Sequence, residues 1–182
     1  MDRDLVERAR HGDDDAFRTL ALGVGDRLFL VAKLILRDAD RAEDAVQDTL
    51  VRAWRELPRL HDPDRFEAWI RRMVVNMCYD EARRERRRVE IRVLPAVAVS
   101  DRTSDMIVRE QLDTGFRRLP VDQRAVLVLH HYLGLSLAEV ADAVGAPLGT
   151  VKSRLHYAIQ AMRAALEADE RASASDDRSR SA

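Results

Sequence analysis

Apolar residues recur every three or four positions along most of the chain, which is the pattern of amphipathic α-helices. The segment 89–104 departs from this period, since apolar and small residues alternate there around Pro95. A strand at 89–93 would have no partner strand, so the segment is interpreted as a linker. The pattern predicts an all-α protein, with helices at residues 2–10, 16–22, 28–36, 41–57 and 66–88, a helix that starts at about 105, one at 121–132, and a final pair within 135–166.

Helix ends are predicted from residues that cap, stop or loosen a helix. Asp13 or Asp14 can cap the second helix, and Pro58 stops the fourth. Gly23 and Gly25 are expected to loosen or bend the chain between the second helix and the third, because glycine is a poor helix former.

The final pair of helices carries the most specific pattern in the chain. Ser136 can N-cap the first of the two, and Glu139 completes a capping box. Gly145 stands where that helix must end. A short helix, a glycine turn and a second helix with a polar start are typical of a helix-turn-helix, whose second helix enters the major groove of DNA. An ordinary helical hairpin with a solvated face has the same pattern.

Charge is unevenly distributed, although the 182 residues carry a formal net charge of only −1. Five of the six residues from Arg83 to Arg88 are arginine. Such a block marks either a solvated helix end or a phosphate-binding stripe. Residues 167–182 contain only Ala, Ser, Asp, Glu and Arg and are predicted to be a disordered tail. Two small helical domains are therefore expected, at 1–88 and 105–166, joined by a flexible linker at 89–104.

Several functional classes are excluded by what the sequence lacks. The single cysteine, Cys78, cannot form an internal disulfide. The apolar run at 28–36 is too short for membrane insertion, and the charged N-terminus lacks a signal peptide, so a cytoplasmic location is expected. His130 and His131 face different ways on a helix, and no metal or other cofactor is expected. No motif for a catalytic nucleophile is present.

Two blocks of the chain resemble a known family. The strings AEDAVQDTLVRAW and FEAWIRRMVVNMCYDEARRERRR resemble region 2 of sigma-70-family initiation factors, and LPVDQRAVLVLHHYLGLSLAEVADAVGAPLGTVKSRLHYAIQAM resembles region 4. The chain leaves no room for region 3 or region 1.1, as in the extracytoplasmic-function (ECF) group. The resemblance implies a transcription initiation factor, not an enzyme, that directs core RNA polymerase to promoters and promotes strand opening.

For the helix at 41–57, the resemblance implies contact with the clamp helices of the polymerase β′ subunit. Acidic and amide groups on a rigid helix suit a partner helix that bears arginines. The implied polymerase-binding residues are Asp44, Gln47 and Asp48, with Arg52 and Arg55 beside them. Without the resemblance, the same residues are interpreted as a solvated helix face.

For the helix that starts at Phe66 and the loop at 60–65, the resemblance implies reading of the minus-ten element as single-stranded DNA. A pocket that accepts a flipped base recovers part of the unstacking energy of melting. Phe66 and Trp69 are assigned to the core. The candidate residues, in which arginines hold phosphates, are Asp62, Arg65, Arg71, Arg72, Asn76, Arg83, Arg84, Arg86 and Arg87.

For the last helix, which is expected to start at Thr150, the resemblance implies major-groove reading of the minus-thirty-five element. The candidates are Thr150, Lys152, Ser153, Arg154, His156 and Tyr157. Arg154 is expected to contact a phosphate or an acidic neighbour, and Tyr157 stands where family members often have a basic residue. The implied partners are core RNA polymerase through its β′ clamp helices and β flap, promoter DNA, and an anti-sigma factor.

Three alternatives remain at the level of sequence. A free-standing helix-turn-helix regulator with a helical dimerisation domain would use Lys152 to Tyr157 in the same way, but it would leave Asp44 and Asp48 without a role. A protein-interaction module of helical bundles would need no DNA contact. An enzyme is the third alternative, although the scattered histidines and carboxylates do not converge in the sequence.

Overall fold

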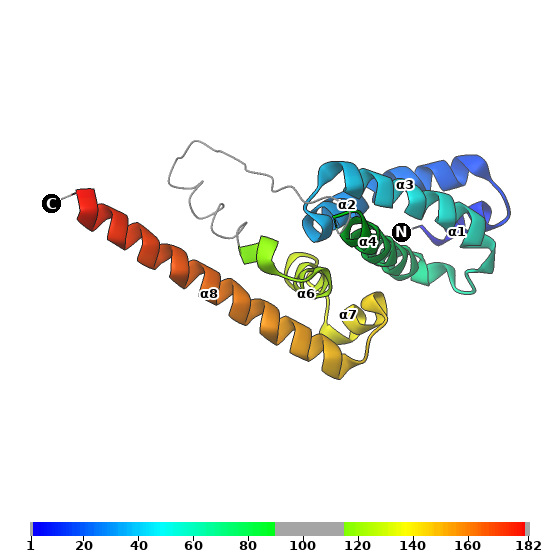
Figure 1. Cartoon of the computed structure of the whole chain (residues 1–182). Coiled ribbons are helices and arrows are strands. Elements are labelled where there is room, and N and C mark those ends of the chain that lie inside the picture. The colour runs from blue at the N-terminus through cyan, green and yellow to red at the C-terminus, as the bar shows by residue number, and fades with distance from the viewer. Residues whose placement is uncertain (1, 90–114, 181–182) are drawn as a thin grey trace.

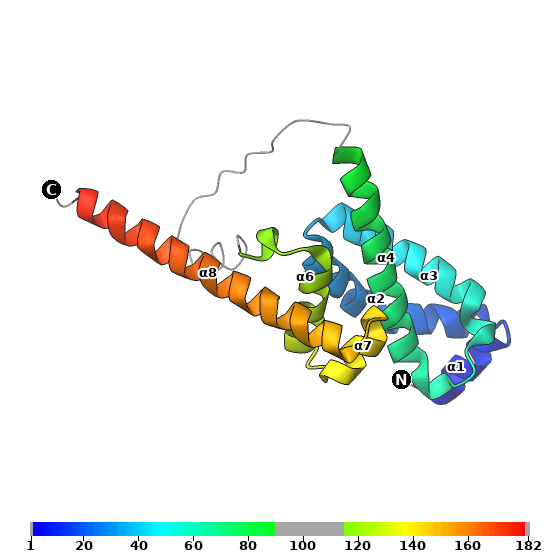
Figure 2. The same ribbon diagram turned by 60° about the horizontal axis from the view of Figure 1, so that its bottom comes forward.

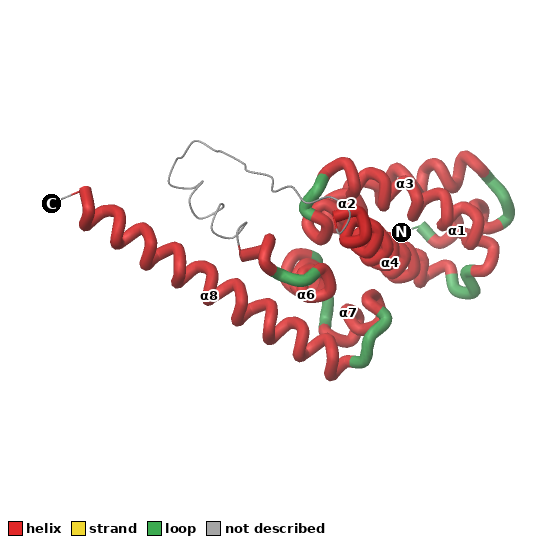
Figure 3. Tube along the Cα trace, viewed as in Figure 1, coloured by secondary structure: helices red, strands yellow, loops and turns green. Residues whose placement is uncertain are grey.

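The chain forms two groups of helices, and the computed structural model describes residues 2–89 and 115–180 (Figure 1). These residues contain helices and connecting loops and no strand, which confirms the all-α prediction (Figure 3). The predicted linker lies outside the described residues from residue 90 on, as does the predicted helix start at 105. The N-terminal group consists of α1 (Arg3–Arg10), α2 (Asp14–Leu36), α3 (Ala39–Glu56), η1 (Leu57–Arg59), η2 (Pro63–Arg65) and α4 (Phe66–Val89).

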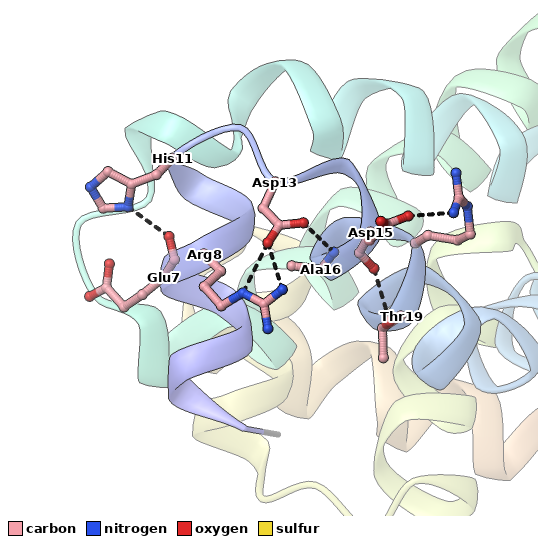
Figure 4. Close-up of polar contacts among 8 residues, drawn as sticks. Glu7, Arg8, His11, Asp13, Asp15, Ala16 and Thr19 are labelled. Atoms are coloured by element: carbon pink, nitrogen blue, oxygen red, sulfur yellow. Dashed lines mark hydrogen bonds and ion pairs between the residues drawn. The ribbon is translucent and has the colours of Figure 1, made fainter.

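The turn between α1 and α2 is fixed by Asp13, one of the two predicted caps. Its carboxylate accepts a hydrogen bond of 2.9 Å from the Ala16 backbone N–H and two from the Arg8 guanidinium, at 2.7 and 2.9 Å (Figure 4). The Ala16 N–H and then Arg8 hold the pKa of the Asp13 carboxyl below its usual range. Asp38 caps α3 in the same way through the Arg41 N–H, at 3.0 Å.

α2 is one continuous helix, and the predicted bend at Gly23 and Gly25 is wrong. Both glycines lie within the helix. A glycine inside a helix costs about 1 kcal/mol relative to alanine. The buried residues Leu20, Val24 and Leu28 continue one apolar stripe through this segment, and burying such side chains contributes about 1.5–3 kcal/mol each. Packing therefore outweighs the local preference.

The C-terminal group consists of α6 (Val121–Leu127), η3 (Val128–Tyr132), α7 (Leu137–Val144) and α8 (Leu148–Arg180). Where one α-helix was predicted at 121–132, the last turn widens into the π-helix η3. The Leu133 N–H donates to the Val128 carbonyl at 3.1 Å, and the ring of His130 hydrogen-bonds the Leu135 carbonyl at 2.6 Å. These hydrogen bonds pair backbone groups that a regular helix end would leave unpaired.

The helix-turn-helix forms as predicted. The Ser136 hydroxyl accepts from the Glu139 N–H and the Glu139 carboxylate accepts from the Ser136 N–H, which completes the capping box. Gly145 ends α7 in the left-handed conformation at φ 65°. α8 starts at Leu148, slightly before the predicted Thr150, and continues to Arg180. It therefore extends through most of the segment predicted as a disordered tail, where alanine is frequent and neither glycine nor proline interrupts the helix.

The two groups of helices dock against each other. α7 lies on α4, and α6 lies on α2 (Figure 2). One apolar cluster runs from Leu20, Ile35 and Val74 in the N-terminal group to Val140 and Val151 in the C-terminal group. A second, smaller cluster joins α6 to α8. No helix among residues 2–89 and 115–180 is long and apolar enough to cross a bilayer.

We expect Gly23→Ala to raise the free energy of unfolding by about 0.5–1 kcal/mol, because alanine gains helix propensity and its methyl group meets nothing within 4 Å. Urea unfolding followed by circular dichroism measures the change. Gly145→Ala serves as the control and should lower the free energy of unfolding, because a left-handed φ costs an L-residue about 1–2 kcal/mol. A destabilised Gly23→Ala variant would contradict the continuous helix.

Candidate functional site

The first candidate surface is the outward face of α3. Asp44, Gln47, Asp48 and Arg55 are exposed along one stripe, and Arg52 is exposed beside it in an ion pair of 2.7 Å with Glu56. On the inward side, Ala42, Ala45, Thr49 and Ala53 are all buried. Small buried residues let α3 approach α2 and α4 closely. The polar stripe is therefore held on a rigid support.

Val51 belongs to the same stripe and was not among the predicted contact residues. Its side chain is 51% exposed, between Asp48 and Arg55. An exposed apolar side chain within a polar helix face offers a partner a contact that excludes water. Its spacing seven residues after Asp44 places it on the stripe and is the sequence signal that could have added it to the predicted set.

The second candidate surface comprises the loop before α4 and the first half of that helix. Asp62 caps η2 by accepting the Asp64 N–H at 3.0 Å, so its carboxylate is engaged with the backbone. Arg65 and Asn76 are exposed. Phe66 is buried, as predicted, and its ring lies 6.0 Å from that of half-buried Trp69.

The arginine block at the end of α4 divides into paired and unpaired side chains. Arg83 pairs with Asp80. Arg84 lies 3.3 Å from the nearly buried Glu81 and 3.7 Å from Asp48 of α3. Within the described part of the chain, Arg86 and Arg87 are exposed and have no ion-pair partner. The two are therefore the members of the block most available to an external anion.

The third candidate surface is the start of α8. Thr150, Lys152, Ser153 and His156 are exposed, and Tyr157 is 61% exposed. The His156 and Tyr157 rings pack edge to face at 5.7 Å. An exposed row of cationic, hydroxyl and aromatic groups at a helix start has the chemistry for reading base edges.

Arg154 differs from its neighbours in α8. Its guanidinium lies 3.0 Å from the Asp122 carboxylate of α6, as the prediction of an acidic neighbour requires. Its side chain is only 27% exposed. The pair holds α8 against α6 and so fixes the orientation of the exposed row.

The docked arrangement brings α7 close to part of the second surface. A Cβ atom on Gly145, in the helix-turn-helix, would lie 3.7 Å from the Arg72 guanidinium of α4. The hydrogen bonds of Ser136 hold the pKa of the Glu139 carboxyl below its usual range, and the positive charge of Arg71 contributes. Arg71, which is partly buried, and Arg72, which remains exposed, thus lie near α7 and its following turn. Sequence reasoning missed this, since no local signal reports it.

Neither a metal centre nor a reactive thiol emerges from the geometry. Residues 2–89 and 115–180 contain no group of three or more side chains of the types that ligate a metal ion. Cys78 is fully buried, and burial raises the pKa of its thiol to about 12.

Two family models match the chain in the order that the sequence predicted. Sigma-70 region 2 matches residues 6–88, and Sigma-70, region 4 matches residues 109–162. The ECF RNA polymerase sigma factor SigL of Mycobacterium tuberculosis is 35% identical over 146 residues, which cover 77% of this chain and 82% of that protein. RNA polymerase sigma-E factor of Streptomyces avermitilis is 32% identical over 176 residues, which cover 94% and 98%.

Solved structures show the same arrangement of helices. CnrH, solved in complex with the cytosolic domain of CnrY, matches with a TM-score of 0.68 and 29% identity, over 92% of this chain and 98% of that one. The sigma factor RpoE of Bartonella quintana, solved with the anti-sigma factor NepR, matches with a TM-score of 0.65 and 27% identity, over 84% and 98%.

The division of the arginine block predicts unequal effects on binding to single-stranded DNA. Arg86→Ala with Arg87→Ala should lower the affinity and reduce the slope of log affinity against log salt by about 1.4, at about 0.7 per phosphate contact. Fluorescence anisotropy with labelled oligo(dT) across a salt series measures both. Arg83→Ala with Arg84→Ala removes the same charge from paired arginines and should have the smaller effect. Equal losses of affinity in the two double variants would contradict the division of the block into paired and unpaired arginines.

Proposed function

Because this chain belongs to the sigma-70 family, in its ECF group, and is a transcription initiation factor, we propose that its three exposed surfaces divide the work of initiation. α3 binds core RNA polymerase, α4 with its preceding loop binds the minus-ten element, and α8 binds the minus-thirty-five element. Sigma factors are transcription factors and not enzymes, and the chemistry of RNA synthesis belongs to the polymerase. We place this chain in the cytoplasm, where it can bind core RNA polymerase.

The polymerase contact uses Asp44, Gln47 and Asp48, with Arg52 and Arg55 at its edge. Two carboxylates and an amide on one rigid stripe can accept hydrogen bonds from arginines of the β′ clamp helices. Val51 lies within the stripe and is available to be desolvated by the partner. Acidic groups around an apolar centre favour the correct orientation of the polymerase on α3 as well as its affinity.

The minus-ten contact uses the loop at 60–65 and the outward face of α4. Arg65 and Asn76 are exposed, and the proposal assigns to them the contact with an unstacked base. The exposed Arg86 and Arg87 extend this face toward the phosphates of the same strand. Base unstacking costs a few kcal/mol, which hydrogen bonds in a pocket and phosphate pairing offset. Base contacts and phosphate contacts together would favour strand opening, although the chain itself catalyses no reaction.

The minus-thirty-five contact uses the first turns of α8 in the major groove, N-terminus first. Lys152, Ser153, His156 and Tyr157 face outward together and Arg154 braces the helix through Asp122. Tyr157 stands where family members often have a basic residue, so a promoter sequence of another family member is not carried over to this chain. The β flap of the polymerase is the partner for the rest of this domain.

The coexistence of a carboxylate-bearing α3 and an arginine-bearing α4 on one rigid unit is the single observation that best supports this proposal. A free-standing helix-turn-helix regulator needs neither surface, and it is not favoured because region 2 and region 4 both match. An anti-sigma factor is a further proposed partner, supported by the complex of the related RpoE with NepR.

Transcription in vitro tests the proposal directly. The purified chain and core RNA polymerase are incubated with a genomic library of linear fragments, and new transcripts are sequenced. Transcripts that depend on the chain and share two upstream motifs would establish the activity and give the promoter sequence. Absence of such transcripts, together with no binding to core polymerase, would overturn it.

Asp44→Arg with Asp48→Arg should abolish binding to core polymerase, because the two reversed charges would face arginines of the clamp helices. Co-elution with core polymerase on size exclusion measures binding, and circular dichroism checks the fold. Asp15→Arg with Asp26→Arg reverses the same number of exposed charges on α2 and should bind normally. A folded α3 variant that still binds would contradict the assignment.

Lys152→Ala with His156→Ala should weaken binding to duplex DNA that carries the minus-thirty-five motif by about 1–3 kcal/mol per lost base contact. Gel shifts with matched and scrambled duplexes separate sequence reading from general attraction to phosphates. Gln160→Ala with Arg163→Ala removes one positive charge further along α8 and should keep the preference for the matched duplex. An unchanged preference in the first variant would show that α8 does not read this element.

A further inference from the structure

We propose that the turn between α3 and α4, which comprises η1 and η2 at residues 57–65, holds phosphates of single-stranded DNA through Arg59 and Arg65. The inference rests on the proposed function and extends it, because Arg59 has no role in the surfaces assigned above. It also gives a role to α1, which carries none of those surfaces. Arg3 of α1 neutralises Asp64, a carboxylate that would otherwise oppose a phosphate at this turn.

The segment 55–65 is electrically neutral in sequence, so its composition indicates no basic patch. Three arginines and three acidic residues alternate along it: Arg55, Glu56, Arg59, Asp62, Asp64 and Arg65. Binding of DNA depends on how charge is distributed over a surface and not on the net charge of a segment. The pairing of each charged side chain therefore decides whether this surface attracts phosphate.

Each acidic residue of the segment is engaged within the protein. The Glu56 carboxylate accepts a hydrogen bond of 2.7 Å from Arg52 of α3. The Asp64 carboxylate accepts one of 2.5 Å from the Arg3 guanidinium, 61 residues away in the chain. Asp62 caps η2 by accepting the Asp64 backbone N–H at 3.0 Å. Two of the three negative charges are thus neutralised by arginines from outside the segment, and the third is bound to the backbone.

The arginines of the same segment are not engaged. Arg55, Arg59 and Arg65 are exposed, and within the part of the chain that the structure describes their side chains have no ion-pair or hydrogen-bond partner. His61, which lies between Arg59 and Arg65, is also exposed. Arg55 is assigned to the polymerase contact above, which leaves Arg59 and Arg65 for DNA. Cations without an internal partner can neutralise phosphates and release the counterions of the strand.

Buried side chains hold this positively charged surface in place. Leu57, Leu60 and Pro63 are buried, so the turn is anchored at every third residue. α1 packs against both η1 and η2, beside the turn that joins α3 to α4 (Figure 2). Arg59 and Arg65 project from a turn that is ordered before DNA arrives, and such a surface loses less conformational entropy on binding than a flexible loop.

The position of the turn favours DNA over other polyanionic partners. Arg65 directly precedes α4, and the exposed side chains of Arg72, Asn76 and Arg87 follow along α4 at helical spacing, on one face. A strand that is bound at the turn therefore continues onto the face to which the proposed function assigns the minus-ten element. None of the large apolar side chains that are exposed in the described residues lies at 57–65, whereas binding to a lipid surface uses such side chains as anchors.

Arg59→Ala tests the phosphate contact in the full chain. The slope of log affinity for labelled oligo(dT) against log salt should fall by about 0.7, the value for one phosphate contact on a single strand, which corresponds to about fourfold weaker binding at roughly 0.15 M salt. Arg18→Ala removes the same charge from an exposed arginine of α2 that is paired with Asp15, and it should leave the slope unchanged. An unchanged slope in Arg59→Ala would overturn the proposal.

A second substitution tests the role of Arg3. Arg3→Ala should weaken binding to oligo(dT) about two- to fourfold, because the Asp64 carboxylate is left without its partner beside the phosphates. Both side chains are more than half exposed, so the fold should be kept, which circular dichroism checks. Arg3→Ala combined with Asp64→Asn should restore the affinity and the salt slope of the unmodified chain. A double variant that binds as weakly as Arg3→Ala alone would show that Arg3 does not act through Asp64.

Two further readouts separate this inference from other outcomes. A hairpin duplex of the same length is the second probe, and an effect of Arg59→Ala on the duplex as large as that on oligo(dT) would overturn the assignment to the single strand. If Arg59→Ala keeps its salt slope while the unmodified chain supports transcription, the inference is wrong and the proposed function stands. Absence of transcription with the unmodified chain, together with no binding to core polymerase, would overturn the proposed function instead.

Discussion

The structure depends on the burial of one face of α4. Phe66, Ile70, Val74 and Cys78 follow one another at helical spacing and are all buried. α2 and α3 pack on this helix from one group, and α6 and α7 pack on it from the other. Because α4 is shared in this way, its remaining surface is fixed relative to the acidic stripe of α3 and also to the helix-turn-helix. Changes in the contacts of α4 therefore act on all three binding surfaces.

Features that depend on neighbouring residues could be predicted from the sequence. The Asp13 cap, the capping box of Ser136 with Glu139, and the end of α7 at Gly145 each require only a few consecutive residues. The bend predicted from the low helix propensity of Gly23 was wrong, because the buried apolar stripe of α2 keeps the helix continuous. The π-helical turn before Leu133 was also missed, because it depends on which carbonyl the His130 ring reaches.

In the candidate surfaces too, features set by nearby residues could be predicted, and contacts between distant residues could not. Exposure of Asp44, Asp48 and Lys152 followed from helical spacing, since each lies opposite an apolar stripe. The pairing of Arg84 with Asp48 joins residues 36 positions apart, and the contact of Arg72 with the Gly145 turn joins residues 73 apart. No periodicity encodes such contacts. Phosphate binding by the arginines therefore stays a prediction from the sequence, while the structure distinguishes the arginines that are paired within the protein from those that are not.

The distribution of strong and weak contacts fits an initiation factor whose two DNA-binding parts must separate. In the proposed function, α4 and α8 read two promoter elements at separate places along the duplex, which would require the two helices to move apart. Within each group, contacts are well formed: caps close the helix ends, small residues let α3 pack closely, and Arg154 braces α8 through Asp122. Between the groups, a small open hollow lies beside Leu133, and burial, together with the positive charges of Arg37 and Arg41, lowers the pKa of Arg124. Rigidity within each group therefore preserves the geometry of the candidate surfaces, which are all exposed in the docked arrangement.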